Sequence, residues 1–406
     1  MSEQGHPGQQ PGQPPGQQPP YGPPPTFPAY PQHPPAYPHQ PEPQWQQPQW
    51  QQPQGYPQQA PAYPQTPYGA IPPVPAPKRP SYPHAEPREY HLILRTWTYA
   101  WWRPVVGIIL LALGMIVVLP LVMLPVLIVG VLVQGGQEDF LDAFLKAGTL
   151  QKLTPAGLLY LNLTLASLVL WTWATVRWLH NLRPRWLASV MPKLRWRFLF
   201  ACLGLSVVAL VAQLAVSLVV PTDQAPDSVQ LNSVTGTTIA LGLIVLLTTP
   251  LQAAGEEYAF RGYLMQAVGS LTKRRWPAIL VSALLFAIAH GLQNPPLFFD
   301  RFMFGLIAAW LVIKTGGLEA GIALHILNNF LAFGLAIVLG DISETLNTTE
   351  ISWWNIPVTL TQSLVYVALV LWVGRKMGMQ TTTRPPVTAP PATPPGSTLP
   401  PVREPA

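Results

Sequence analysis

The chain has little of two things that soluble and secreted proteins depend on, cysteine and charge. Cys202 is the only cysteine among 406 residues, so the chain can form neither an intrachain disulfide nor a site with several thiolate ligands. Charged residues make up 10% of the chain, against about a quarter in an average soluble domain. These shortages exclude a disulfide-stapled secreted domain, a cysteine-rich zinc module and an ordinary soluble enzyme.

Proline, by contrast, is abundant at the two ends of the chain. Of the 51 prolines, 29 lie in residues 1–90 and 9 in residues 381–406. Both segments have few aliphatic side chains, so they cannot bury enough surface to offset the entropy lost on ordering. We expect two disordered cytoplasmic tails, the first rich in Pro, Gln and Tyr and the second in Pro and Thr. Spaced Tyr and Trp side chains in the first tail suit a partner protein that recognises proline motifs.

Residues 91–380, between the tails, are predicted to form a polytopic membrane domain. About 20 consecutive apolar residues are needed to cross a bilayer as a helix. Apolar runs of this kind cover residues 105–133, 158–179, 198–220, 238–258, 278–290, 302–313, 318–339 and 356–373. The fifth and sixth are short enough to be either re-entrant or spanning, and we count both as spans. The predicted fold class is therefore all-α, a bundle of about eight transmembrane helices.

The distribution of positive charge predicts the orientation of this bundle. Most Lys and Arg residues lie in the N-terminal flank and after the even-numbered runs, for example in residues 183–197 and 273–275. Cytoplasmic loops of membrane proteins carry such an excess, so both termini are expected on the cytoplasmic side of the cell membrane. The net charge of +6 then reflects topology and does not indicate binding to nucleic acid.

A few ionisable or amide side chains lie inside or at the ends of these apolar runs. Such groups cost about 3 kcal/mol or more when charged at the bilayer centre, so they usually line a polar cavity. They are Glu256, Glu257 and Arg261 at the cytoplasmic end of the fourth run, His290 at the end of the fifth, and His325 and Asn329 in the seventh. We expect the three helices to converge on one cavity.

Helical spacing sorts these side chains by direction. Glu257 and Arg261 are four residues apart, so they share a face and can form an ion pair. Glu256 is rotated by about 100° from Glu257, so it is expected to point elsewhere. His325 and Asn329 also share one face of their helix.

A carboxylate, two imidazoles and a carboxamide suit the hydrolysis of a peptide bond. A carboxylate and an imidazole can share one water and remove its proton. A second imidazole and a carboxamide can donate hydrogen bonds to the oxyanion that forms. Cys202 lies in another run without a charged neighbour and is expected to pack. Two His and one Glu could also hold zinc, but the HExxH spacing of many zinc peptidases is absent, so zinc is the less favoured alternative.

Three short motifs follow one another along these helices. EEYAFR matches EExxxR, FAIAH matches FxxxH and HILNN matches HxxxN, in that order. Together they resemble the motifs of the CPBP family of intramembrane peptidases (CAAX protease and bacteriocin-processing, or Abi), whose eukaryotic relatives are the type II CAAX prenyl endopeptidases. The resemblance covers about residues 198–373, which would form the catalytic core, and leaves the tails and the first two spans unexplained.

The resemblance implies a role for each motif position. Glu256 would be the general base that activates water together with His290, and His325 and Asn329 would form the oxyanion site. Glu257 and Arg261 would support them by orienting Glu256. Asn328 faces His325 as well, at i+3, but the family spacing favours Asn329.

The predicted function is therefore an intramembrane endopeptidase that acts on a membrane-associated protein or peptide. One alternative is a non-catalytic membrane scaffold or bacteriocin-immunity protein that acts through its Pro-rich tail. A proton-coupled transporter is a third hypothesis, since Glu and His side chains also form proton relays in membranes.

Overall fold

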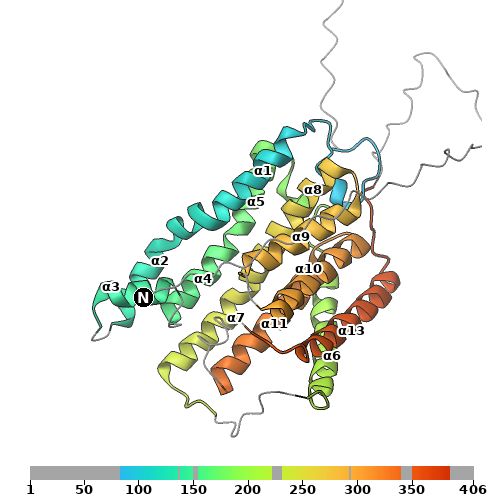
Figure 1. Cartoon of the computed structure of the whole chain (residues 1–406). Helices are drawn as coiled ribbons and strands as arrows, with labels where there is room; N and C mark the ends of the chain where they lie inside the picture. The colour runs from blue at the N-terminus through green and yellow to red at the C-terminus, as the bar shows by residue number, and fades with distance from the viewer. Residues whose placement is uncertain are drawn as a thin grey trace, which may run out of the picture. The chain divides into compact units, whose positions relative to one another are not determined.

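A computed structural model describes residues 83–135, 138–149, 154–221, 231–291, 294–339 and 350–384. These residues belong to one compact unit, which is helical apart from two isolated β-bridges (Figure 1). The predicted tails lie outside the described residues, except for residues 83–90 and 381–384. Residues 83–90 pack against the helices, since the side chains of His84 and Tyr90 are buried.

Seven helical segments of the described chain are long and apolar enough to cross a membrane. They are α1–η2–α2 (Trp102–Leu113, Gly114–Val118, Leu119–Gln134), α4–α5 (Pro155–Ala166, Leu168–Leu179), α6 (Trp196–Ser217), α7–η4–α8 (Gly236–Glu257, Tyr258–Leu264, Met265–Thr272), α10 (Pro295–Thr315), α11 (Glu319–Leu339) and α13 (Asn355–Lys376). The apolar helix α9 (Arg275–Ala289) is shorter, with 15 residues. The predicted all-α membrane bundle is confirmed, and the protein is an integral membrane protein.

The two ends of the described unit meet on one side of the bundle. The backbone N–H of Thr383 donates to the carbonyl oxygen of Arg88 at 2.9 Å, and the Thr383 hydroxyl accepts from the Arg88 N–H at 2.8 Å. An odd number of crossings would leave these residues on opposite sides of a membrane. Seven crossings would not bring these residues to one side, whereas α9 as an eighth crossing, the number expected from the sequence, would do so.

The fourth span is longer than the sequence suggested. Its predicted end at residue 258 is wrong, because the helix continues through the π-helical segment η4 and through α8 to Thr272, 37 residues in all. Glu256 and Glu257 consequently lie in the middle of this helix and not at its cytoplasmic end. Hydropathy falls after residue 258 because Arg261 and Gln266 are polar, yet both are fully buried in protein.

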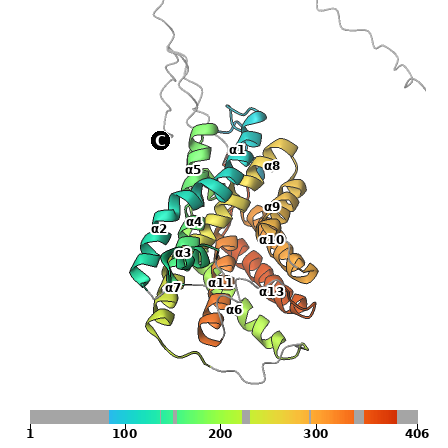
Figure 2. The ribbon, with the colours of Figure 1, turned by 60° about the vertical axis from the view of Figure 1, so that its left-hand side comes forward.

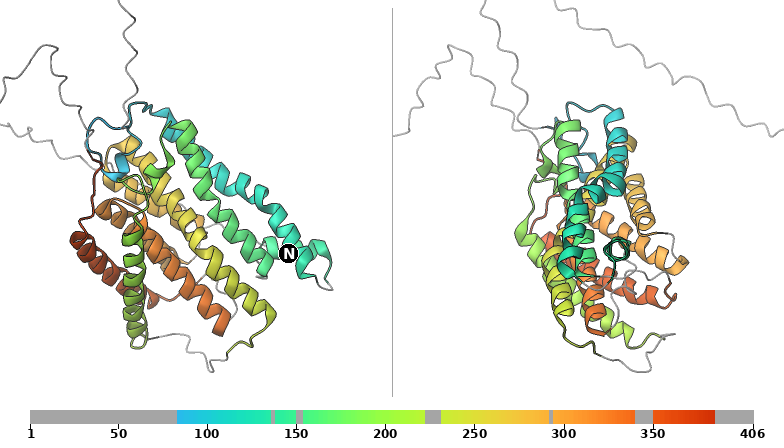
Figure 3. Two further views of the ribbon diagram at one scale, coloured as in Figure 1. Left: turned by 180° about the vertical axis from the view of Figure 1, so that it is seen from behind. Right: turned by 90° about the vertical axis from the view of Figure 1, so that its left-hand side faces the viewer.

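Helices α7 and α11 lie side by side through the centre of the bundle (Figures 1 and 3). Helices α1, α2, α4 and α5 lie on one side of this central pair, and α6 and α13 on the other. Helix α10 packs against α9, α11 and α13, which brings α9 to the central pair (Figure 2). Gly255 allows α7 to approach α4 closely, because a Cβ atom there would lie 2.0 Å from the Leu165 carbonyl oxygen.

A buried ion pair holds the start of α11. Arg195, just before α6, donates from Nε to Oε1 of Glu319 at 2.8 Å and from Nη2 to Oε2 at 2.5 Å. Its Nη1 also donates to the carbonyl oxygen of Thr315 at the end of α10. Through this one guanidinium, Glu319 at the start of α11 is joined to α6 and α10, which fixes the beginning of the helix that carries His325.

Candidate active site

Glu257 and Arg261 form the ion pair that their spacing predicts. Nη1 of Arg261 donates to Oε1 of Glu257 at 2.9 Å, and neither side chain is exposed. The guanidinium also lies over the Phe286 ring of α9, 3.9 Å from its centroid, and 5.5 Å from the Phe304 ring centroid of α10. Cation–π contacts of this kind are strongest where water is excluded. The two rings and the carboxylate together hold Arg261 in place.

His325 lies between the two carboxylates. Its Nδ1 is 3.0 Å from Oε1 of Glu257, and its Nε2 is 3.5 Å from Oε2 of Glu256. Because a carboxylate only accepts hydrogen bonds, Nδ1 is the donor to Glu257. Glu256 does not pair with Arg261, as predicted, but the expectation that it points away from Glu257 is wrong, since one imidazole contacts both carboxylates.

A glycine on α11 makes room for this contact. A Cβ atom at Gly321 would lie 2.6 Å from Oε2 of Glu257, so any other residue there would push the carboxylate or the helix aside. Gly321 lies four residues before His325, on the same helical face. Glu257 can therefore reach His325 because this position has no side chain.

Gln252 belongs to the site and was missed by the sequence interpretation. Its Nε2 donates to Oε1 of Glu256 at 2.6 Å, and its Oε1 accepts from Nδ2 of Asn329 at 2.8 Å. It thus connects the carboxylate on α7 to the carboxamide on α11. A signal was present, because Gln252 is a polar residue four positions before Glu256 in an apolar run.

The two neighbouring asparagines of α11 face different partners. Asn329 binds Gln252, whereas Oδ1 of Asn328 accepts from Nε2 of Gln362 on α13 at 2.9 Å. Asn329 is therefore the residue of the pair that is linked to Glu256.

His290 lies at the edge of this cluster, immediately after α9. Its Nδ1 donates to the Phe286 carbonyl oxygen at 2.9 Å, so its Nε2 is left with a free lone pair. The Phe286 ring contacts both histidines, with its centroid 4.5 Å from that of His290 and 5.9 Å from that of His325. Glu256 lies within electrostatic range of His290. The structure thus brings all six predicted residues to one region, with His290 linked through an aromatic ring and without a hydrogen bond to Glu256 in the described part of the chain.

The cluster is almost closed to solvent. The exposed fraction is 6% for Glu256 and 4% for His325, and it is zero for Glu257 and Arg261. Two carboxylates and one guanidinium give a formal charge of −1, and an imidazolium at His325 would bring it to zero. Oε2 of Glu256 has no hydrogen-bond partner among the described residues. Oε2 of Glu257 also lacks one, so each of the two carboxylates keeps one open acceptor oxygen.

The described residues do not assemble two His and one Glu into a zinc site. In the described part of the chain, no group of three or more His, Cys, Asp and Glu side chains is placed to hold a metal ion. Oε1 of Glu257 is already occupied by Arg261 and His325, and Nδ1 of His290 by a backbone carbonyl. The chemistry of the site is therefore derived from its own side chains.

Comparison with known proteins places the same residues in one family. Residues 236–331 match the family model of the "Type II CAAX prenyl endopeptidase Rce1-like" proteins. The uncharacterised protein YyaK of Bacillus subtilis (strain 168) is 28% identical over 218 residues, which cover 50% of this chain and 71% of that relative. No solved structure matches the chain. The matched segment holds α7, η4, α8, α9, α10 and the first part of α11, with all six motif residues. Residues 236–331 are therefore a domain similar to the Rce1-like type II CAAX prenyl endopeptidases.

Proposed function

We propose that the protein is an intramembrane endopeptidase that hydrolyses a peptide bond of a membrane-associated protein or peptide. One observation carries this proposal. Glu256, Gln252 and Asn329 form a continuous hydrogen-bonded chain between α7 and α11, and His325 contacts Glu256 at its other oxygen. A base and two groups suited to an oxyanion thus lie on facing helices inside the family domain.

Glu256 is the general base in this mechanism. Gln252 holds Oε1, so Oε2 is the oxygen directed at the attacking water. His290 accepts a hydrogen bond from the same water at Nε2, while Glu256 takes the water's other proton as the oxygen attacks the scissile carbonyl and then passes that proton to the leaving amine. General-base assistance of this kind contributes about 10²–10⁴-fold to a rate.

His325 and Asn329 stabilise the oxyanion. Glu257 accepts a hydrogen bond from Nδ1–H of His325, which leaves Nε2 for the reaction, and a protonated Nε2 donates to the developing oxyanion. Asn329 donates from Nδ2 once substrate displaces its bond to Gln252. Arg261 holds the Glu257 carboxylate in its orientation. Such donors act more strongly in a water-excluded site than in water.

We place the side on which Arg88 and Thr383 meet at the cytoplasm. The basic turn at Lys273–Arg275 and the basic segment before α6 belong to this side, and cytoplasmic loops carry such an excess of Lys and Arg. A partner protein that recognises proline motifs is predicted for the N-terminal tail, and most of this tail lies outside the described residues.

The test compares membrane peptidomes of cells that carry the intact protein, Glu256→Gln, or the matched control Glu138→Gln. Glu138 is exposed and lies outside the matched domain, and among the described residues its side chain pairs with Lys146. We expect the products to disappear with Glu256→Gln and to persist with Glu138→Gln, at equal amounts of inserted protein. Normal processing by Glu256→Gln would overturn the proposal, and loss of processing on chelation alone would show that a metal takes part.

A further inference from the structure

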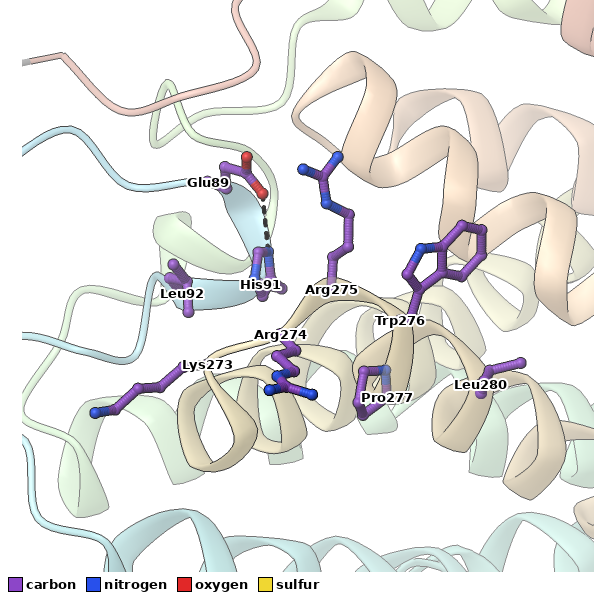
Figure 4. Close-up of a pocket in the computed structure, with 9 residues that line it drawn as sticks. All are labelled: Glu89, His91, Leu92, Lys273, Arg274, Arg275, Trp276, Pro277 and Leu280. Atoms are coloured by element: carbon purple, nitrogen blue, oxygen red, sulfur yellow. Dashed lines mark ion pairs between the residues drawn. The ribbon is translucent and has the colours of Figure 1, made fainter. Parts of the chain in front are cut away.

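A cavity of about 670 Å³ lies away from the candidate active site, where α8 turns into α9. Its walls come from two parts of the chain, the turn η1 (Tyr90–Leu92) with Glu89 before it, and residues 273–280 (Figure 4). The volume lies within the range of about 300–1,000 Å³ that is usual for small-molecule sites. Neither the family match, which assigns no residue of this cavity a role, nor the proposed mechanism uses it.

The cavity is held open by the backbone. Lys273 ends α8 with a positive φ of 60°, and the chain reverses its direction there. The three consecutive basic residues 273–275 therefore lie at the turn between α8 and α9. The η1 turn is pressed against α8 at Gly269, where a Cβ atom would lie 2.3 Å from the carbonyl oxygen of His91. Both walls are therefore fixed by main-chain geometry.

The lining carries an excess of positive charge. Lys273, Arg274 and Arg275 are exposed and make no side-chain hydrogen bond or ion pair with any described residue. The carboxylate of Glu89 opposes them and lies 3.4 Å from Nδ1 of His91. Burial lowers the pKa of His91 below its ordinary 6.5 and outweighs the opposite effect of Glu89, so His91 is neutral at pH 7. Three cations less one carboxylate leave a formal charge of +2.

The directions of the basic and apolar side chains indicate which kind of ligand the cavity suits. In Figure 4, Arg275 extends upward beside Trp276, whereas Arg274 lies below the η1 turn and Lys273 extends away from both. Trp276 is 55% exposed and Leu280 is 46% exposed, so an apolar surface continues from the cations along α9. Cations beside an exposed Trp and Leu suit a ligand that is anionic at one end and apolar at the other.

We propose that this cavity binds the phosphate-bearing headgroup of an anionic lipid, with the acyl chains lying along Trp276 and Leu280. The cations stand where the α7–η4–α8 span ends and α9 begins, which is the level of the lipid phosphates. A soluble phosphate would use the cations and leave the apolar surface without a role. Basic residues next to a span attract anionic lipids in general, and here the cavity gives them a defined site.

The test measures lipid retention by native mass spectrometry. The full-length protein, released from detergent, is titrated with phosphatidylglycerol and with phosphatidylcholine. The variant Arg274→Gln/Arg275→Gln removes two of the three cations that line the cavity. The control Arg183→Gln/Arg185→Gln removes two exposed arginines of another loop that we place on the same side. Unchanged thermal unfolding and gel-filtration profiles show that each variant is folded.

We expect wild type and control to retain phosphatidylglycerol in preference to phosphatidylcholine. The cavity variant should bind phosphatidylglycerol about tenfold more weakly, because two cations near the lipid phosphate are lost. Two further titrations add inorganic phosphate or an acidic peptide as a competitor of phosphatidylglycerol, and they show whether the site binds a lipid, a free phosphate or a peptide. Equal lipid binding by all three proteins would overturn the proposal. So would displacement of phosphatidylglycerol by millimolar inorganic phosphate, or cavity-dependent binding of the peptide alone. Loss of proteolysis by Glu256→Gln bears only on the active site.

Discussion

Gly321 shows how one missing side chain positions the candidate active site. Glu257 reaches His325 across the space that a Cβ atom at this position would fill. The same carboxylate receives Arg261, so displacing it would affect both partners. The contact between α7 and α11 is thus set by the absence of a methyl group.

Gly321→Ala is therefore expected to reduce proteolysis by at least about tenfold, since small displacements of catalytic groups cost factors of this size. The measurement is product formation in membranes with equal amounts of inserted protein. Gly334→Ala is the matched control, because it lies on the same helix and a Cβ atom there meets open space. Equal loss in both variants would show that the effect comes from the helix and not from Glu257.

Gln252 allows a second prediction. Gln252→Leu replaces the hydrogen-bonding partner of Glu256 and Asn329 with an apolar side chain of similar size. Glu256 therefore loses the contact that fixes its orientation. We expect kcat to fall by about 10–100-fold with little change in KM, because the loss concerns groups that act in the transition state. Gln362→Leu, which affects only Asn328, serves as the control. A change in KM alone would contradict a positioning role.

Sequence reasoning found the six motif residues but not their full set of contacts. Spacing along one helix predicts the pair of Glu257 with Arg261, because both belong to the same face. The bridge through Gln252 and the position of His325 between two carboxylates depend on how α7 and α11 pack. Such contacts between helices depend on where glycines let the helices approach and on the angle at which they cross. Neither can be obtained from the hydropathy of the sequence.

At the scale of single elements, the π-helical segment η4 is the irregular part of the longest helix. It carries Arg261 and also Tyr263, whose hydroxyl is 2.9 Å from Nε2 of His180 at the end of α5. Short π-helical segments are frequent at functional sites. The hydropathy pattern placed the end of this span too early, because polar residues lower the hydropathy even where they are buried inside the protein.

The contact of His180 with η4 gives the bundle a dependence on pH. Burial, with a smaller effect of Arg103, lowers the pKa of His180 from 6.5 to about 4. Below pH 6.5 the unfolded chain therefore takes up a proton that the folded protein does not, and folding stability falls as pH falls. The loss approaches about 3 kcal/mol near pH 4, from a difference of about 2.5 pKa units.

Thermal unfolding in detergent at pH 7.5, 6 and 5 measures this effect. We expect Tm to fall toward low pH in the wild type and to fall less in His180→Gln, which keeps a polar side chain beside Tyr263 and does not titrate. Parallel curves for the two proteins would exclude His180 as the cause.

At the scale of the whole molecule, the hydrogen bonds between Arg88 and Thr383 favour an even number of membrane crossings between these two residues. The sequence predicted eight spans from apolar runs, and the short fifth run could be read either as spanning or as re-entrant. The hydrogen bonds between the two ends of the described unit decide in favour of an even number. This information lies in long-range contacts and could not be obtained from hydropathy.

Single cysteines test this topology, because the native Cys202 is fully buried and can be replaced by Ala. Arg185→Cys and Arg375→Cys should react with an impermeant maleimide only after the cells are opened. Val234→Cys, 83% exposed at the other end of the bundle, should react in intact cells. Different behaviour of positions 185 and 375 would contradict the eight crossings.

The short length of α9 has a consequence for the surrounding bilayer. Its 15 residues extend about 22 Å, whereas the hydrocarbon core is about 30 Å thick. Hydrophobic mismatch of this size thins the bilayer locally. His290, at the end of α9, would then lie where the bilayer is locally thinner and water has a shorter path to Glu256, the proposed general base. Proteolysis should accordingly be faster in vesicles of short-chain lipids than in those of long-chain lipids, and equal rates would exclude a contribution from the thinning.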